Sequence, residues 1–116
     1  MKFYKENNTN NIVTDKEIEN YDNYTLIEAN SVDAAIEKHV PTYEVKDNKL
    51  LVQVGSVEHP MTSEHYIMWI AQVYGDNIIK KELKPSDKPI AEFDYIKDSV
   101  IYAYCNLHGL WMKVVD

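Results

Sequence analysis

Apolar residues in the second half of the chain recur in short runs that are separated by turn residues. The runs are rich in β-branched and aromatic side chains and cover residues 50–54, 65–74, 78–83, 90–96, 99–105 and 110–115. Gly55, Gly75, Pro85 and Pro89 stand between some of them. Short strands at this spacing favour an all-β sandwich over a parallel α/β sheet, which needs helical patterns of about 10–15 residues between its strands.

The first part of the chain has a different pattern. Residues 1–30 are polar and rich in asparagine, with only short apolar pieces, so we expect a small N-terminal appendage that cannot bury a core of its own. The main domain is expected to cover residues 31–116. Ser31, an early aspartate and two alanines predict a short helical stretch that ends near Pro41.

Composition narrows the class of protein. A chain of 116 residues with 45% hydrophobic residues fits one compact domain. Its net charge of −7 argues against nucleic-acid binding, which needs a basic face. We find no signal-peptide pattern and no membrane-spanning apolar run, and therefore expect a cytoplasmic protein. The single cysteine excludes an internal disulfide and the zinc sites built on two or four cysteines.

The residues that could carry chemistry lie close together in the sequence. All four histidines and the only cysteine fall in residues 37–41, 59–65 and 105–109. Taken alone, a histidine is usually a surface or hydrogen-bonded residue, and a lone cysteine is usually a small core residue. As a set they carry more weight, because most lie near predicted strand ends or loops, where ligands tend to be placed. Cys105 and His108 are separated by two residues, which lets thiolate and imidazole converge on one ion.

The donor set indicates which metal would bind. Four imidazoles and one thiolate suit iron, copper or zinc and are poorly suited to magnesium or calcium. Five donors exceed the four of a structural zinc site, which favours an ion of higher coordination number with one open position, and iron fits best. A rival interpretation is a hydrolase in which one histidine activates the Cys105 thiolate. That reading leaves three histidines unexplained, and Cys105 ends a strand-like run instead of beginning a helix.

Three motifs resemble one known family, the superoxide reductases, also called neelaredoxins and desulfoferrodoxins. The similarity covers about residues 26 to 113, with the motifs in the family's order and approximate spacing. The motifs are Glu37-Lys38-His39-Val40-Pro41, then His59-Pro60-Met61 with Glu64-His65-Tyr66-Ile67 and Trp69, and finally Cys105-Asn106-Leu107-His108-Gly109 with Trp111.

The resemblance implies a seven-stranded, immunoglobulin-like β-sandwich that holds one mononuclear iron. By motif position, the equatorial imidazoles would be those of His39, His59, His65 and His108, and the axial thiolate would be that of Cys105. Glu37 matches the family's glutamate that occupies the sixth position in the ferric state. Lys38 matches the lysine that guides superoxide and helps its protonation.

The N-terminal segment departs from the larger members of the family. Those members carry a small desulforedoxin-like domain with four cysteines around a second iron, and residues 3 to 30 resemble its remnant. Other residues stand at the cysteine positions, namely Glu6, Thr9, Glu19 and Asn20. We therefore expect residues 1–30 to bind no metal and to pack on the main domain or on a neighbouring subunit.

The family resemblance predicts a superoxide reductase that makes hydrogen peroxide with electrons from a rubredoxin-like donor. A homo-oligomer, either a dimer or a tetramer, is expected by analogy, with no nucleic-acid or membrane partner. The alternative from another class is a non-enzymatic β-sandwich that binds or senses iron or zinc through the same five residues. Because superoxide is an anion and the chain is acidic, the iron centre and Lys38 must create local positive charge.

Overall fold

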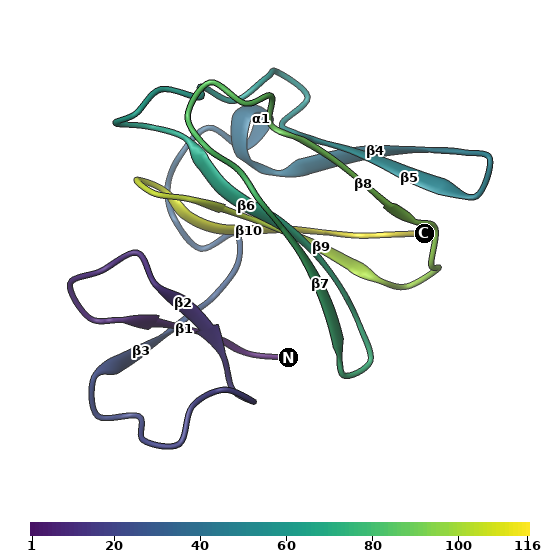
Figure 1. Ribbon diagram of the computed structural model, residues 1–116. Coiled ribbons are helices and arrows are strands. Elements are labelled where there is room, and N and C mark those ends of the chain that lie inside the picture. Colours follow the sequence, from purple (N-terminus) through teal and green to yellow (C-terminus); the bar gives the residue numbers. More distant parts are fainter.

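The structure, a computed structural model, describes all residues from 1 to 116. The chain forms ten strands and one short helix that are arranged in three sheets (Figure 1). The elements are β1 Phe3–Glu6, β2 Ile12–Thr14, β3 Tyr24–Ile27, α1 Ile36–His39, β4 Pro41–Lys46, β5 Lys49–Val54, β6 Ile67–Tyr74, β7 Asn77–Glu82, β8 Ile90–Asp94, β9 Val100–Cys105 and β10 Gly109–Val114.

Seven of the strands form a β-sandwich, which confirms the fold class expected from the sequence. One sheet has the order β10-β9-β6-β7 and the other the order β4-β5-β8, and every pairing is antiparallel. Side chains from both sheets fill the space between them, among them Leu50, Ile70, Phe93 and Ile101, which are at most 4% exposed. Burial of this apolar surface is the main force that holds the two sheets face to face.

The N-terminal residues form a third layer. Strands β2, β1 and β3 pair as a small antiparallel sheet (Figure 1, purple to blue). Phe3 and Ile12 of this sheet pack against the outer face of the four-stranded sheet, in a second cluster with Trp69, Tyr104 and Leu110. The small sheet therefore completes its core with side chains that the main domain supplies.

Strand β6 lies between both cores, which explains why its residues are apolar except for Gln72. Ile70 points into the sandwich, whereas Trp69 and Ala71 point toward the N-terminal sheet. The pairing of β6 with β9 shifts register between Ile67 and Trp69. This β-bulge lies next to the strand ends that carry the candidate ligands, a common position for a bulge that redirects side chains.

Two local features differ from the expectation. The helix is shorter and begins later than predicted, because the Ser31 hydroxyl donates to the carbonyl of Glu28 and does not cap it. Strand β4 was not predicted, since its sequence begins with a proline and its last three residues, which are exposed, include the charged Glu44 and Lys46. Its backbone is paired along its whole length with β5, so sheet pairing compensates for the weak sequence signal.

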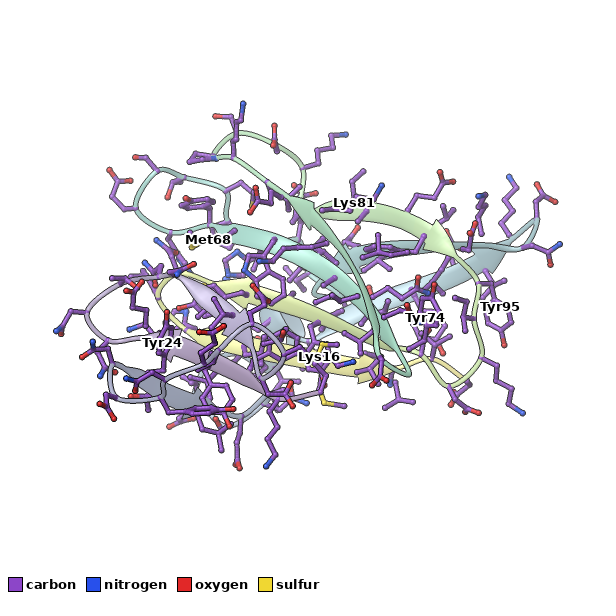
Figure 2. All side chains as sticks on the ribbon, turned by 60° about the horizontal axis from the view of Figure 1, so that its bottom comes forward. Lys16, Tyr24, Met68, Tyr74, Lys81 and Tyr95 are labelled. Carbon is purple, nitrogen blue, oxygen red and sulfur yellow. The ribbon has the colours of Figure 1, made fainter.

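The N-terminal layer and the sandwich are also joined at the surface. Lys16 forms a salt bridge of 3.0 Å with Asp76, in the turn between β6 and β7. Figure 2 shows that Lys16 lies near the middle of the molecule, between Tyr24 of the N-terminal sheet and Tyr95 at the far end of the sandwich. The only helix, α1, has four residues, which is far too short to span a membrane.

Candidate metal centre

Five side chains converge at one end of the sandwich. This is the end where the ribbon carries α1 (Figure 1). His39 closes the short helix, His59 lies in the loop after β5, and His65 precedes β6. Cys105 ends β9, and His108 lies in the turn that leads into β10. The topology brings these loops together because β5, β6 and β9 all have one end on the same side of the sandwich. The structure thus unites all the residues predicted as metal ligands.

The four imidazole rings occupy the corners of a square. Going round it, the ring centroids of His39 and His59 are 4.7 Å apart, and those of His59 and His65 are 4.6 Å apart. The remaining sides, from His65 to His108 and back to His39, measure 5.0 and 4.8 Å. The diagonal from His39 to His65 is longer, at 6.2 Å. The rings therefore surround one common centre.

The distances between ring nitrogens fit a metal ion at that centre. Nε2 of His39 lies 3.1 Å from Nε2 of His59 and 3.1 Å from Nδ1 of His108. A square with sides of 3.1 Å has its centre about 2.2 Å from each corner, close to the metal–imidazole bond length of about 2.0–2.1 Å. His108 therefore faces the centre with Nδ1, whereas His39 and His59 use Nε2.

Cys105 supplies a fifth donor atom. Its sulfur is fully buried and lies 3.9 Å from Nδ1 of His108. The ligand atoms of His39, His59, His65 and Cys105 all lie within 4.8 Å of one another. Because the rings fill the corners of the square, the sulfur can approach the centre only from one side of it. The backbone amides of Leu107 and His108 donate hydrogen bonds to this sulfur.

Hydrogen bonds define the tautomers of two rings. Nδ1 of His39 lies 2.7 Å from the carbonyl oxygen of Ala35, and Nδ1 of His59 lies 2.7 Å from that of Pro60. A carbonyl oxygen only accepts, so each Nδ1 carries the hydrogen and each Nε2 presents a lone pair. These lone pairs face each other at 3.1 Å, and the buried Nε2 of His65 has no partner. The donor atoms therefore fit around a cation, which would satisfy all of them at once.

The electrostatics of the cluster favour metal binding over protonation. Burial lowers the pKa of His39 and His65, and it lowers the pKa of His59 to about 4. These imidazoles are therefore neutral at pH 7, which is the form that binds metals. Burial raises the pKa of the Cys105 thiol, and the amides of Leu107 and His108 oppose that rise. A bound cation would stabilise the thiolate directly.

Trp111 supports two of the ligands. Its ring stacks on the imidazole of His39 with centroids 4.9 Å apart and planes inclined by 27°. Its Nε1 donates a hydrogen bond of 3.1 Å to the backbone carbonyl of His108. In the sequence, Trp111 stands out only as part of the third motif. The hydrogen bond, like the carbonyl partners of the imidazoles, has no sequence signal because any residue type provides a backbone carbonyl.

The structure places Glu37 and Lys38 on the rim of the site, in the exposed part of α1. The charge of Lys38 lowers the pKa of His39 and His65, so its ammonium group acts on two corners of the square. The charge of Glu37 raises the pKa of His39. The structure does not bring the Glu37 carboxylate among the ligand atoms. Neither side chain takes part in a salt bridge.

The turn after β5 is in close contact with the backbone of α1 and of Val40. Gly55 has a φ of +82°, and a Cβ atom at this position would lie 2.7 Å from the carbonyl oxygens of both Glu37 and Lys38. The amide of Val57 donates to the carbonyl of Glu37, and that of Gly55 donates to the carbonyl of Val40. Glycine is required here because the backbone is left-handed and the two segments are in close contact.

Comparisons with known proteins agree with this geometry. The family model described as Desulfoferrodoxin matches residues 31–114. A desulfoferrodoxin of Clostridium acetobutylicum is 53% identical over 85 residues, which is 73% of this chain and 68% of the relative.

Two solved structures are similar as well. The superoxide reductase from Treponema pallidum superposes with a TM-score of 0.69 and is 41% identical, covering 78% of this chain and 77% of the other. The one-iron superoxide reductase from Giardia intestinalis has a TM-score of 0.59 and 31% identity, covering 69% of this chain and 98% of the other.

Proposed function

This chain belongs to the desulfoferrodoxin family, and on that premise we propose that it is a superoxide reductase. Superoxide takes up one electron and two protons and leaves as hydrogen peroxide. The observation that carries this proposal is the square of four imidazoles with the buried Cys105 sulfur on one side. The ligands we assign are His39, His59, His65, Cys105 and His108.

The donor set fits a mononuclear, non-haem iron. Imidazole and thiolate are borderline to soft ligands, and five protein donors are one too many for tetrahedral zinc. A bound iron supplies one-electron chemistry by alternating between its ferrous and ferric states. The protein would contribute neutral imidazoles and the Cys105 sulfur, and we propose that the substrate approaches from the side of the square opposite this sulfur.

Lys38 is assigned the role of attracting the substrate. The chain carries a net charge of −7, which repels superoxide at long range. At physiological salt this repulsion is screened over about 8 Å, so a nearby ammonium group dominates the last stage of approach. Lys38 is exposed, forms no salt bridge and acts electrostatically on His39 and His65. It is therefore free to pair with the anion and to pass on a proton from solvent.

Glu37 is assigned the role of closing the site when the centre is oxidised and no substrate is bound. It precedes Lys38 on the same exposed turn, and its charge reaches His39. We propose that its carboxylate approaches the open side of the oxidised centre after product has left. The backbone of Glu37 is held to the β5 turn, because its carbonyl accepts a hydrogen bond from the amide of Val57.

Each superoxide that is reduced consumes one electron, so repeated turnover requires an external electron donor. We propose a small rubredoxin-like carrier. Leu107 supports a contact near the ligands, since it is 60% exposed and lies between Cys105 and His108. We also propose a homo-oligomer in the cytoplasm, with no nucleic-acid or membrane partner.

The domain division is part of the same proposal. We assign residues 1–30 to a vestigial desulforedoxin-like segment without metal and residues 31–116 to the iron-binding domain. The only cysteine and all four histidines lie in the second part. The candidate ligands likewise all belong to it.

The decisive experiment measures products. Iron-loaded, reduced protein is mixed anaerobically with superoxide, and peroxide, dioxygen and the visible spectrum are followed. A reductase oxidises its iron rapidly and yields one peroxide for each superoxide without dioxygen. A dismutase would yield half as much peroxide together with dioxygen. Tightly held zinc, or iron that superoxide does not oxidise, would instead support the non-enzymatic metal-binding alternative.

A further inference from the structure

Asn106 connects two of the loops that carry metal ligands. Its Nδ2 donates a hydrogen bond of 3.0 Å to the carbonyl of Glu64, and its Oδ1 accepts one of 3.0 Å from the amide of Tyr66. Its own backbone amide donates to the carbonyl of Tyr66 at 3.3 Å. One residue between Cys105 and His108 therefore binds the chain on both sides of His65.

His65 depends on this support more than His39 and His59 do. His39 and His59 each have a ring nitrogen held by a backbone carbonyl at 2.7 Å. No hydrogen bond reaches either nitrogen of the His65 ring, and its buried Nε2 is unpartnered. Only packing and the backbone around it can determine the orientation of this ring.

Two sets of contacts hold the backbone at His65. One set shapes the turn, and the other fixes the position of the turn relative to β9. Thr62 exchanges hydrogen bonds with the backbone of His65, which shapes the turn between them. Those bonds stay within one short turn and do not locate it relative to β9. Asn106 provides that link, at the point where the regular ladder of β6 and β9 ends with Ile67 opposite Cys105.

We propose that Asn106 is a positioning residue that holds His65 at its corner of the square and thereby sets how tightly the metal is retained. This inference rests on the proposed metal site. Residues that orient metal ligands typically change metal affinity by about 10–100-fold when they are replaced. The side-chain amide is suited to the task because it donates to one neighbour of His65 and accepts from the other at the same time.

The test uses cobalt(II) as the probe, because it requires no turnover and its visible bands distinguish four from five ligands. Affinity is measured by competition with a chelator on metal-free protein, for the wild type, Asn106→Ala, His65→Ala and the double variant. Asn106→Ala is expected to weaken binding about 10–100-fold and to shift the spectrum toward four ligands. In the His65→Ala background the same replacement should change affinity less than about twofold, because the two residues act as one unit.

A matched control separates positioning from general loosening of the fold. Asn7→Ala removes another amide contact, a 2.6 Å hydrogen bond from Thr25 in the N-terminal sheet, and is expected to leave cobalt affinity unchanged. Melting of the metal-free variants shows whether Asn106→Ala is folded. Asn106→Ser, which keeps a polar group too short to reach both partners, serves as a milder variant.

Each outcome decides one question. If the wild type binds no cobalt through its thiolate, the proposed function fails. If the wild type binds five-coordinate cobalt and Asn106→Ala binds it equally well, only the role of Asn106 is overturned. An equal loss in both backgrounds would also overturn it, because Asn106 would then act through the Cys105 loop instead of His65.

Discussion

The N-terminal sheet and the ligand-bearing end of the sandwich both depend on β6 and β9, but through different forces. The N-terminal sheet is attached by apolar packing, with Phe3 and Ile12 against Trp69 and Tyr104, and by few polar contacts. The ligand-bearing end is organised by directed contacts, in which carbonyls, amides and ring stacking each determine the orientation of a side chain. Packing tolerates substitutions that preserve volume, whereas a ligand set tolerates almost none.

This difference predicts opposite responses in the two regions. Changes at the ligand-bearing end should abolish chemistry while leaving the N-terminal sheet in place. Changes in the N-terminal sheet should reduce stability while leaving the metal bound.

The largest effect is expected from Cys105→Ser. The replacement removes the only thiolate, so the visible thiolate-to-iron charge-transfer band should disappear and superoxide reduction should fall at least about 100-fold. Amide hydrogen exchange in β1 and β2 should stay as in the wild type, because these strands touch no ligand. A band that survives the replacement would show that the sulfur does not bind the metal.

Phe3→Ala tests the other region. Phe3 is 3% exposed and packs on Trp69 and Tyr102, so its truncation should cost about 3 kcal/mol in the free energy of unfolding. Chemical denaturation measures this loss, and limited proteolysis should cut within residues 1–30 first. Ile12→Val is the milder companion, with an expected cost of about 1 kcal/mol. Loss of iron in Phe3→Ala would contradict the separation of the two regions.

Lys38→Ala should slow the second-order reaction with superoxide about tenfold and flatten its dependence on ionic strength. Iron content should be unchanged, because Lys38 is not a ligand. Lys16→Ala is the matched control, since it removes the same charge from the N-terminal region and should leave the rate unaltered. Equal rates for Lys38→Ala and the wild type at low salt would remove Lys38 from the mechanism.

A more gradual effect is expected from pH on the metal-free protein. The pKa of His59 is lowered to about 4 in the folded protein by burial, below the ordinary value of 6.5, so the unfolded chain binds more protons between these values. Stability should therefore be fully present above about pH 6.5 and decline as the pH falls toward 4. Hydrogen exchange should show the loosening at the ligand-bearing loops first, because residues 1–30 contain no histidine. A stability independent of pH across this range would contradict the burial of neutral His59.

Most of the fold could be predicted from the sequence because buried strands appear as short runs of β-branched and aromatic residues. The runs at residues 50–54 and 99–105 correspond closely to β5 and β9. Strand β4 has a weaker apolar pattern, since half of its residues are exposed and its strand conformation depends on pairing with β5. The predicted helix extended too far toward the N-terminus because Ser31 was expected to cap it. In the structure the Ser31 hydroxyl instead donates a hydrogen bond to the carbonyl of Glu28, which precedes it in the chain.

The sequence alone determined which chemical groups are available as donors, because four imidazoles and one thiol are a property of residue types. Only the tertiary structure decided their order around the square, the choice of Nδ1 at His108, and the support that Trp111 and Asn106 provide. These features depend on contacts between residues far apart in the chain and on backbone carbonyls and amides that every residue type carries. The spacing of residues along a sequence indicates neither the long-range contacts nor the backbone partners, since these contacts form only when the strands have paired.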